Sequence, residues 1–169
     1  MAAPDARMRD VELLLRLVAW MRFAKRYVGN MRPFLDEAMK DLNDEWIKGR
    51  VAVEQVVGDA LAGAAAACAL FGSDVARKFK AGKYERAVNC AVFELQALTL
   101  VDRSVARAAL ARKQQVMRGF ERLCTGTEFL ASLEATTKSI ENYQLRFDHY
   151  SSMLTEVIGR RVSAIRFGQ

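Results

Sequence analysis

The stretch from Asp10 to Val28 constrains the fold more than any other part of the chain. It reads DVELLLRLVAWMRFAKRYV. Its polar stripe is narrow, because it follows a single row at steps of three or four residues in which even Ala19 is apolar: Glu12, Arg16, Ala19, Arg22 and Arg26. The rest of the helical surface is apolar. A helix that is apolar around most of its circumference is usually surrounded by other helices. We therefore expect this helix to lie at the centre of an all-α bundle.

The rest of the chain continues this helical pattern. Pro33 is the only proline after the first few residues, and it lies where the first turn of a helix accepts it. We expect a single-domain orthogonal bundle of about six or seven helices over residues 10–158, between a flexible lead-in (1–9) and a basic tail (159–169). The expected helices cover residues 10–28, 30–49, 51–70, 84–101, 103–123, a short stretch from 127, and 139–158, with a helical turn over 74–80.

Composition excludes several classes of protein. The 169 residues are 51% hydrophobic and 27% charged, which favours one globular core over disorder. The three cysteines are widely spaced and odd in number, as expected of reduced thiols in a cytoplasmic protein: Cys68, Cys90 and Cys124. No signal peptide is visible. The apolar run Ala60–Phe71 is shorter than the roughly 20 residues that span a bilayer, so we expect no membrane contact.

No catalytic, cofactor-binding or metal-binding residue is expected. His149 is the only histidine, and no cysteine, serine or carboxylate stands at a suggestive spacing from it. The glycines Gly58, Gly63 and Gly72 lack the GK[ST] sequence of a phosphate loop and suit helix packing and capping. Helical neighbours Asp36 and Glu37 point apart and make a poor acid–base pair.

Basic residues give the only candidate binding surface. The net charge is +6, and the expected helix 103–123 is rich in arginine with few acidic neighbours. Such a surface is typical of proteins that bind phosphates non-specifically, and equally of a solvated helix face. No aromatic residues alternate with the charges, as stacking on single strands would require. The candidate residues are Arg103, Arg107, Arg112, Lys113, Arg118, Arg122, Arg160 and Arg161.

Four segments, in order along the chain, resemble one protein family. They are DVELLLR from Asp10, FLDEAM from Phe34, LFG ending at Gly72, and NCAVFE from Asn89, where Val88 replaces the usual phenylalanine. They are similar to the C-terminal helical part of the GmrSD-type restriction-system family. The residues that carry the resemblance are Asp10, Glu12, Arg16, Phe34, Leu35, Phe71, Gly72, Asn89, Phe93 and Glu94; Phe129, Thr137, Arg146 and Phe147 fit a weaker late pattern.

The family's catalytic parts have no counterpart in this sequence. Its N-terminal ParB-like domain carries a DGQQR motif and its nuclease partner domain is of the HNH type, and neither pattern occurs here. The resemblance therefore implies a non-catalytic scaffold or interaction module of a bacterial restriction-like or anti-phage defence protein. Its partner would be a ParB-like DGQQR protein or a second copy, bound through the first and third helices. The alternative is a non-specific nucleic-acid-binding subunit of a nuclease or NTPase complex.

Overall fold

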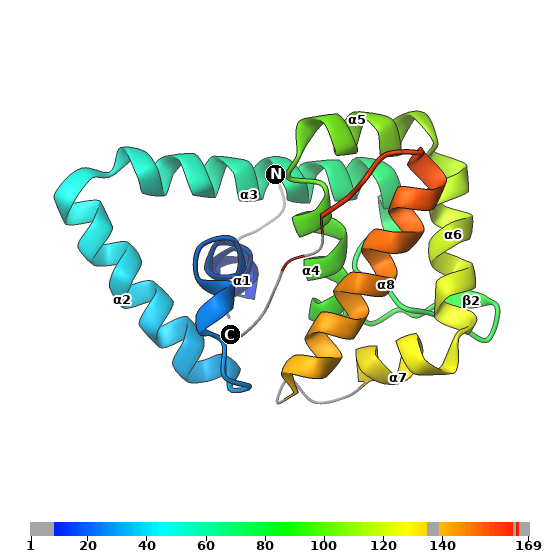
Figure 1. The fold of residues 1–169 in the computed structure, drawn as a ribbon, viewed down its shortest axis with the longest axis horizontal. Coiled ribbons are helices and arrows are strands. Elements are labelled where there is room, and N and C mark those ends of the chain that lie inside the picture. Colours follow the sequence, from blue (N-terminus) through cyan, green and yellow to red (C-terminus); the bar gives the residue numbers. More distant parts are fainter. Residues whose placement is uncertain (1–8, 135–138, 164, 166–169) are drawn as a thin grey trace.

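The computed structural model describes residues 9–134, 139–163 and 165, and within them the fold is all-α (Figure 1). Residues 1–8 of the predicted lead-in (1–9) and Thr137 lie outside the described residues, and Arg9 already belongs to the first helix. Eight α-helices and one short hairpin make up the described part. The elements are α1 (Arg9–Phe23), η1 (Ala24–Arg26), α2 (Met31–Gly49), α3 (Val51–Phe71), η2 (Gly72–Asp74), β1 (Phe79–Lys80), β2 (Lys83–Tyr84), α4 (Cys90–Thr99), α5 (Arg103–Ala111), α6 (Lys113–Thr125), α7 (Thr127–Glu134) and α8 (Ile140–Ile158).

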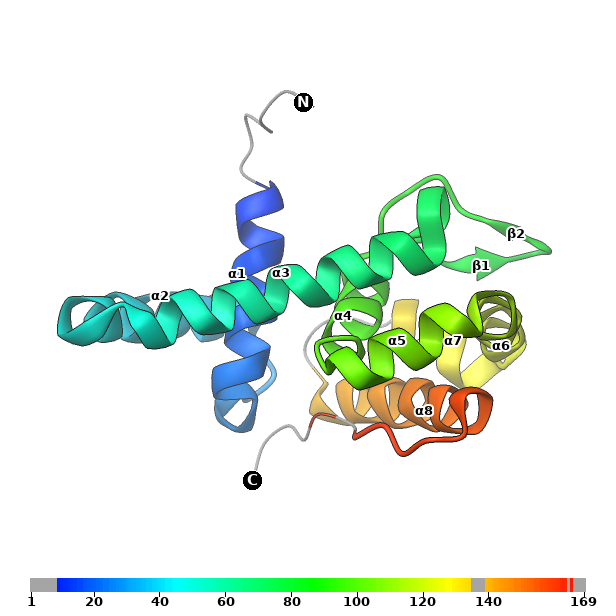
Figure 2. The same ribbon diagram turned by 90° about the horizontal axis from the view of Figure 1, so that it is seen from above.

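Helix α1 lies at the centre of the first half of the molecule, whereas its sequence predicted a place at the centre of the whole bundle. Figure 1 shows it end-on in the angle between α2 and α3, and it also contacts α4. Figure 2 shows that it crosses α3 steeply, as in an orthogonal bundle. Leu17, Val18 and Trp20 are buried, whereas Leu14 is half-buried. The apolar circumference of the helix is therefore covered from several directions.

Helices α4 to α8 form the second half of the molecule. Nearly every residue from Val92 to Leu100 is buried, because α4 packs between α1, α3 and α8. Helix α8 begins after Ser139, whose hydroxyl accepts a hydrogen bond from the Asn142 backbone N–H at 3.2 Å, as expected of an N-cap. Helix α3 is long enough to belong to both halves (Figure 2).

Several predicted boundaries were wrong. The single helix 103–123 is two helices, α5 and α6, which meet at Arg112. The first helix ends at Phe23, and Asn30 precedes α2 without a side-chain capping bond. In the tail, Val162 is buried and its N–H donates to the Thr155 hydroxyl at 3.0 Å, so at least this part of the tail packs against α8.

The segment expected to be helical from Tyr84 is instead a hairpin followed by an extended connection. Phe79 pairs with Tyr84 and Lys80 with Lys83, and Ala81 and Gly82 form the turn with positive φ angles of 51° and 76°. Backbone hydrogen bonds, including Asn89 N–H to Ala76 O at 2.7 Å, continue past the hairpin. Helix α4 begins only after these bonds.

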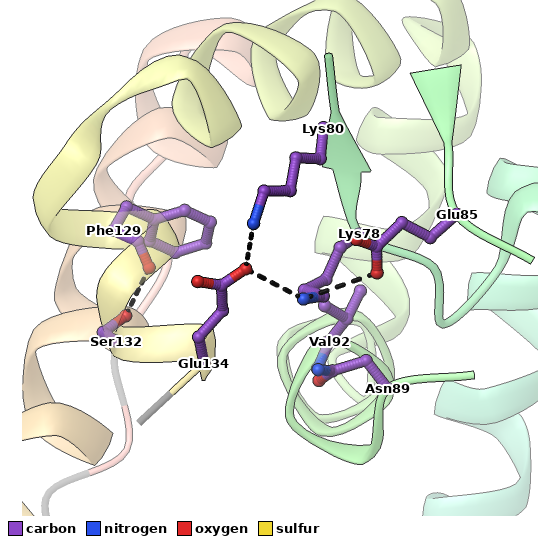
Figure 3. Close-up of polar contacts among 8 residues, drawn as sticks. All are labelled: Lys78, Lys80, Glu85, Asn89, Val92, Phe129, Ser132 and Glu134. Atoms are coloured by element: carbon purple, nitrogen blue, oxygen red, sulfur yellow. Dashed lines mark hydrogen bonds and ion pairs between the residues drawn. The ribbon is translucent and has the colours of Figure 1, made fainter. Parts of the chain in front are cut away.

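Ion pairs fasten the hairpin to its surroundings (Figure 3). Glu134, at the end of α7, accepts from Lys80 at 2.6 Å and from Lys78 at 3.2 Å, and Lys78 also lies 3.4 Å from Glu85. Both lysines lower the pKa of the Glu134 carboxyl, chiefly by hydrogen bonding. The hairpin therefore depends on contacts with α7. The local sequence of the hairpin does not predict these contacts.

Helix α3 is the one described helix long and apolar enough to cross a membrane by length and composition alone. The qualifying stretch runs from Val51 to Asp74 and has a mean hydropathy of 1.6. Its inner face is packed within the fold, where Ala60, Ala67 and Leu70 are fully covered. Core helices of bundles pass the same test, so this property by itself assigns no membrane role.

Candidate functional site

The residues of the family-like motifs meet in a buried ion pair. Arg16 of α1 donates from Nε to Glu94 Oε1 of α4 at 2.6 Å, although 78 positions separate the two in sequence. Both side chains are almost completely buried. Glu12, one turn earlier in α1, lies 3.8 Å from Arg16, which is the pairing that their i,i+4 spacing predicts. The shorter and more buried bond to Glu94 joins two helices of the fold.

A cluster of aromatic rings surrounds this ion pair. Trp20 lies 4.8 Å from Phe34 of α2 and 4.9 Å from Tyr143 of α8 between ring centroids. Arg146, also on α8, places its guanidinium 4.3 Å from the Tyr143 ring centre and donates from Nε to the carbonyl of Asn142. Side chains from α1, α4 and α8 therefore meet around one buried carboxylate, and Phe34 of α2 packs against the Trp20 ring of this cluster.

Burial controls the protonation of this cluster. Desolvation raises the pKa of Glu94, while Arg16, Arg146 and Trp20 oppose the rise. The pKa of Arg16 is raised because Glu94 and Tyr143 outweigh its own desolvation, so the guanidinium stays charged. Burial also raises the pKa of Tyr27 to about 12.

The remaining motif residues also have structural contacts. Asn89 is the N-cap of α4, where its side chain accepts from the Val92 N–H at 3.0 Å (Figure 3). Gly72 ends α3 with a φ of 59°, which favours glycine. Phe71 packs edge-on against Phe120 of α6 at 5.7 Å between centroids. Leu35 is buried, Phe93 is half-buried, and Asp10 accepts from the Val11 N–H.

Two of the basic candidates support helix ends. Arg112 Nη1 donates to the carbonyl of Ile158 at 2.6 Å, at the end of α8. Lys113 Nζ donates to the carbonyl of Ala69 at 2.8 Å, near the end of α3. Cations at helix C-termini satisfy carbonyls that have no partner within the helix and interact favourably with the helix dipole. These contacts give Arg112 and Lys113 a structural role.

We expect Arg112→Gln to lower the free energy of unfolding by about 1–2 kcal/mol, because the carbonyl of Ile158 loses a charged donor. The matched control is Arg107→Gln, which removes the same charge from an exposed position of α5 and should change stability by less than about 0.5 kcal/mol. Urea denaturation followed by circular dichroism measures both. Equal stability of the two variants would contradict the capping role.

The other six basic candidates are exposed and fall into two groups. Arg103 and Arg107 lie on α5, and Arg160 and Arg161 follow α8. Because the chain turns at Arg112, the second group, Arg118 and Arg122 on α6, does not continue the face of α5 (Figure 1). None of the six has an ion-pair partner among the described residues. The single basic helix face predicted from the sequence was therefore wrong, but six arginines remain accessible.

The α6 pair lines an open groove of about 710 Å³ between α6, α8 and the hairpin. Arg118 and Arg122 share it with Phe79 and with the acidic side chains of Glu121 and Glu156. This mixture of charges suits no single class of small ligand. Among the described residues, no group of three or more His, Cys, Asp or Glu side chains could hold a metal ion.

Sequence reasoning missed two features of this region. Arg146 was noted only for its place in a weak motif, yet it is 1% exposed and belongs to the buried cluster. The signal was its position on the apolar face of α8, one turn from Tyr143 and Tyr150. The ion pairs of Lys78 and Lys80 with Glu134 join segments that are distant in sequence, and no local sequence pattern predicts them.

A comparison with known protein families gives no match, and neither curated proteins nor solved structures match this chain.

Proposed function

We propose that this chain is a non-catalytic helical interaction module of a bacterial restriction-like or anti-phage defence protein, similar to the C-terminal helical part of GmrSD-type proteins. The buried Arg16–Glu94 pair is the observation that supports this proposal most. Its two residues are the most distinctive charged residues of the motifs, and they hold two helices together. Motif residues that are buried between helices and hold them together build a scaffold. The partner is a ParB-like DGQQR domain or a second copy of the chain.

Exposed apolar side chains supply surfaces for such partners. At the corner between α2 and α3, Ile47 is 82% exposed and Val51 74% exposed, next to the half-exposed Trp46. Near the start of α1, Val11 is exposed, and the exposed Val88 lines a hollow together with Leu13 and Cys90. Large exposed apolar side chains that cluster on a surface often mark sites of protein interaction.

Reconstitution with a separately expressed ParB-like DGQQR domain tests the proposal. Mixed with this chain, that domain should co-elute on size exclusion, and Val11→Glu/Val88→Glu should weaken the complex more than the matched surface change Ala131→Glu on α7. Nucleotide hydrolysis by the purified chain alone would contradict the non-catalytic role. So would the absence of any complex, with the ParB-like domain or between copies.

The six accessible arginines favour a second candidate function, non-specific binding of nucleic acid. Neutralising phosphates releases counterions, so the logarithm of affinity should fall linearly with the logarithm of salt concentration. We expect Arg118→Gln/Arg122→Gln to reduce that slope by about 1–2, because each lost phosphate contact removes roughly one unit. Fluorescence titration of a labelled duplex at several salt concentrations measures the slope.

The matched control is Lys40→Gln/Lys48→Gln, which removes the same charge from exposed positions of α2. It should leave the slope unchanged. Undetectable duplex binding by the unaltered chain at low salt would remove nucleic acid from the list of partners.

A further inference from the structure

Helix α6 carries a polar outward face. Its inner side is apolar, since Val116, Phe120 and Cys124 recur at steps of four residues and are buried. Opposite them lie the exposed side chains that we call the α6 face: Gln114, Gln115, Arg118 and Arg122. Glu121 lies at the edge of this face, where it is half-buried and accepts a hydrogen bond from the Tyr84 hydroxyl at 3.3 Å. The α6 face itself is therefore a row of amide and guanidinium groups.

These groups have the chemistry that recognises duplex DNA. Glutamine can form two hydrogen bonds with adenine N6 and N7 in the major groove, and arginine binds phosphate oxygens. Among the described residues, neither Arg118 nor Arg122 has an ion-pair partner, so both guanidinium groups are available to a ligand. A protein partner would be favoured by large apolar side chains at the centre of the contact, and the α6 face has none.

The β-hairpin and α8 flank the α6 face (Figure 1). Helix α8 approaches at Gly119, where an added Cβ atom would lie 2.7 Å from Met153 Sδ. Its exposed acid Glu156 lines the groove beside the α6 face. The hairpin offers an exposed cation, Lys83, next to its turn. A polyanion on the α6 face is therefore repelled from the α8 side and attracted to the hairpin side.

Helices α5 and α6 meet at a sharp corner. Figure 1 shows α6 descending from the end of α5, and Figure 2 shows α6 end-on while α5 lies across the view. In helix-turn-helix proteins, a similar pair places its second helix in the major groove, where the N-terminal residues of that helix contact base edges. Gln114 and Gln115 lie in the first turn of α6. The corner differs from that motif in having a single residue, Arg112, between the helices.

We propose that the α6 face binds the major groove of duplex DNA, with Gln114 and Gln115 hydrogen-bonded to base edges and Arg118 and Arg122 to phosphates. This rests on the second candidate function, non-specific binding of nucleic acid, and adds to it a preference for particular bases. Double-stranded RNA is a poor fit, because the narrow major groove of its A-form helix does not admit side chains.

Selection from a library of random DNA duplexes, followed by fluorescence titration, tests the reading of bases. The enriched duplex should contain adenine and bind about tenfold or more tightly than a scrambled duplex, since one bidentate base contact discriminates to that extent. Gln114→Ala/Gln115→Ala should lose this preference but keep its affinity for the scrambled duplex within about twofold. The matched control Gln55→Ala, at an exposed position of α3, should keep the preference. Circular dichroism verifies that each variant is folded.

Modified bases test which groove is read. Replacing the adenines of the enriched duplex by 7-deazaadenine removes the N7 acceptor from the major groove, and should abolish the preference. Replacing them by 3-deazaadenine, which alters the minor groove, should leave the preference in place. The reverse result would overturn binding in the major groove.

Enrichment of no sequence, or a preference that Gln114→Ala/Gln115→Ala leaves intact, would overturn the proposal while non-specific binding of nucleic acid stands. If the unaltered chain binds no duplex at low salt, the proposal and the second candidate function both fail. Equal affinity for double-stranded RNA would also overturn the proposal. So would loss of the complex with a ParB-like domain in Gln114→Ala/Gln115→Ala, which would assign the α6 face to a protein partner.

Discussion

Replacing Arg16 by methionine should destabilise the protein by about 3–5 kcal/mol. The substitution keeps much of the side-chain volume but leaves the Glu94 carboxylate buried without its closest cation. Arg22→Met, which breaks an exposed pair with Glu45, is the matched control and should cost at most about 1 kcal/mol. Urea denaturation monitored by circular dichroism measures both. Similar losses for the two variants would show that burial of the Arg16 pair is unimportant.

The loss in Arg16→Met should depend on pH in a defined direction. Without Arg16, desolvation raises the pKa of Glu94 in the folded state further above its value in the unfolded chain. A carboxyl with a raised folded-state pKa costs nothing below the unfolded pKa of about 4.3 and costs increasingly as the pH rises through the folded pKa. The difference in unfolding free energy between Arg16→Met and the unaltered chain should therefore be smaller at acidic pH than at neutral pH.

Gly63→Ala should destabilise the protein although alanine is the better helix former. A Cβ atom at position 63 would lie 2.5 Å from the carbonyl oxygen of Ala97 and 2.9 Å from Val101 Cγ2, so α3 and α4 would have to separate. Overpacking of this kind costs about 1–3 kcal/mol.

Gly58→Ala in the same helix is the matched control, since nothing lies within 4 Å of its Cβ position. It should stabilise the protein by about 0.5–1 kcal/mol through helix propensity alone. Thermal and urea unfolding of the two variants should therefore change in opposite directions. Stabilisation of both would mean that α3 and α4 do not approach as closely as described.

Helical periodicity sufficed to predict the fold class. The apolar surface of α1 predicted that other helices surround it, and the burial of Leu17, Val18 and Trp20 confirms this. In α8, Tyr143, Tyr150 and Leu154 recur at helical spacing, and all three are buried. These predictions succeed because burial on one side of a helix leaves a pattern within a few residues of sequence.

The features that the sequence did not predict depend on distant segments. The break between α5 and α6 has no glycine or proline at Arg112, and it coincides with the bond from that side chain to Ile158. The partner of Arg16 predicted from spacing was Glu12, because local periodicity carries no information about Glu94 on another helix. The basic candidates failed to form one face for the same reason, since the chain changes direction between them.

A double-mutant cycle on Arg16 and Glu94 tests most directly the central claim, that the motif residues join the helices of a scaffold. It compares the unfolding free energies of Arg16→Met, Glu94→Leu, the double variant and the unaltered chain at neutral pH. We expect the double variant to be more stable than Arg16→Met, with a coupling energy above about 2 kcal/mol, because neither charge of the Arg16–Glu94 pair then remains buried without the other. Additive losses, with a coupling energy within about 0.5 kcal/mol of zero, would contradict the claim.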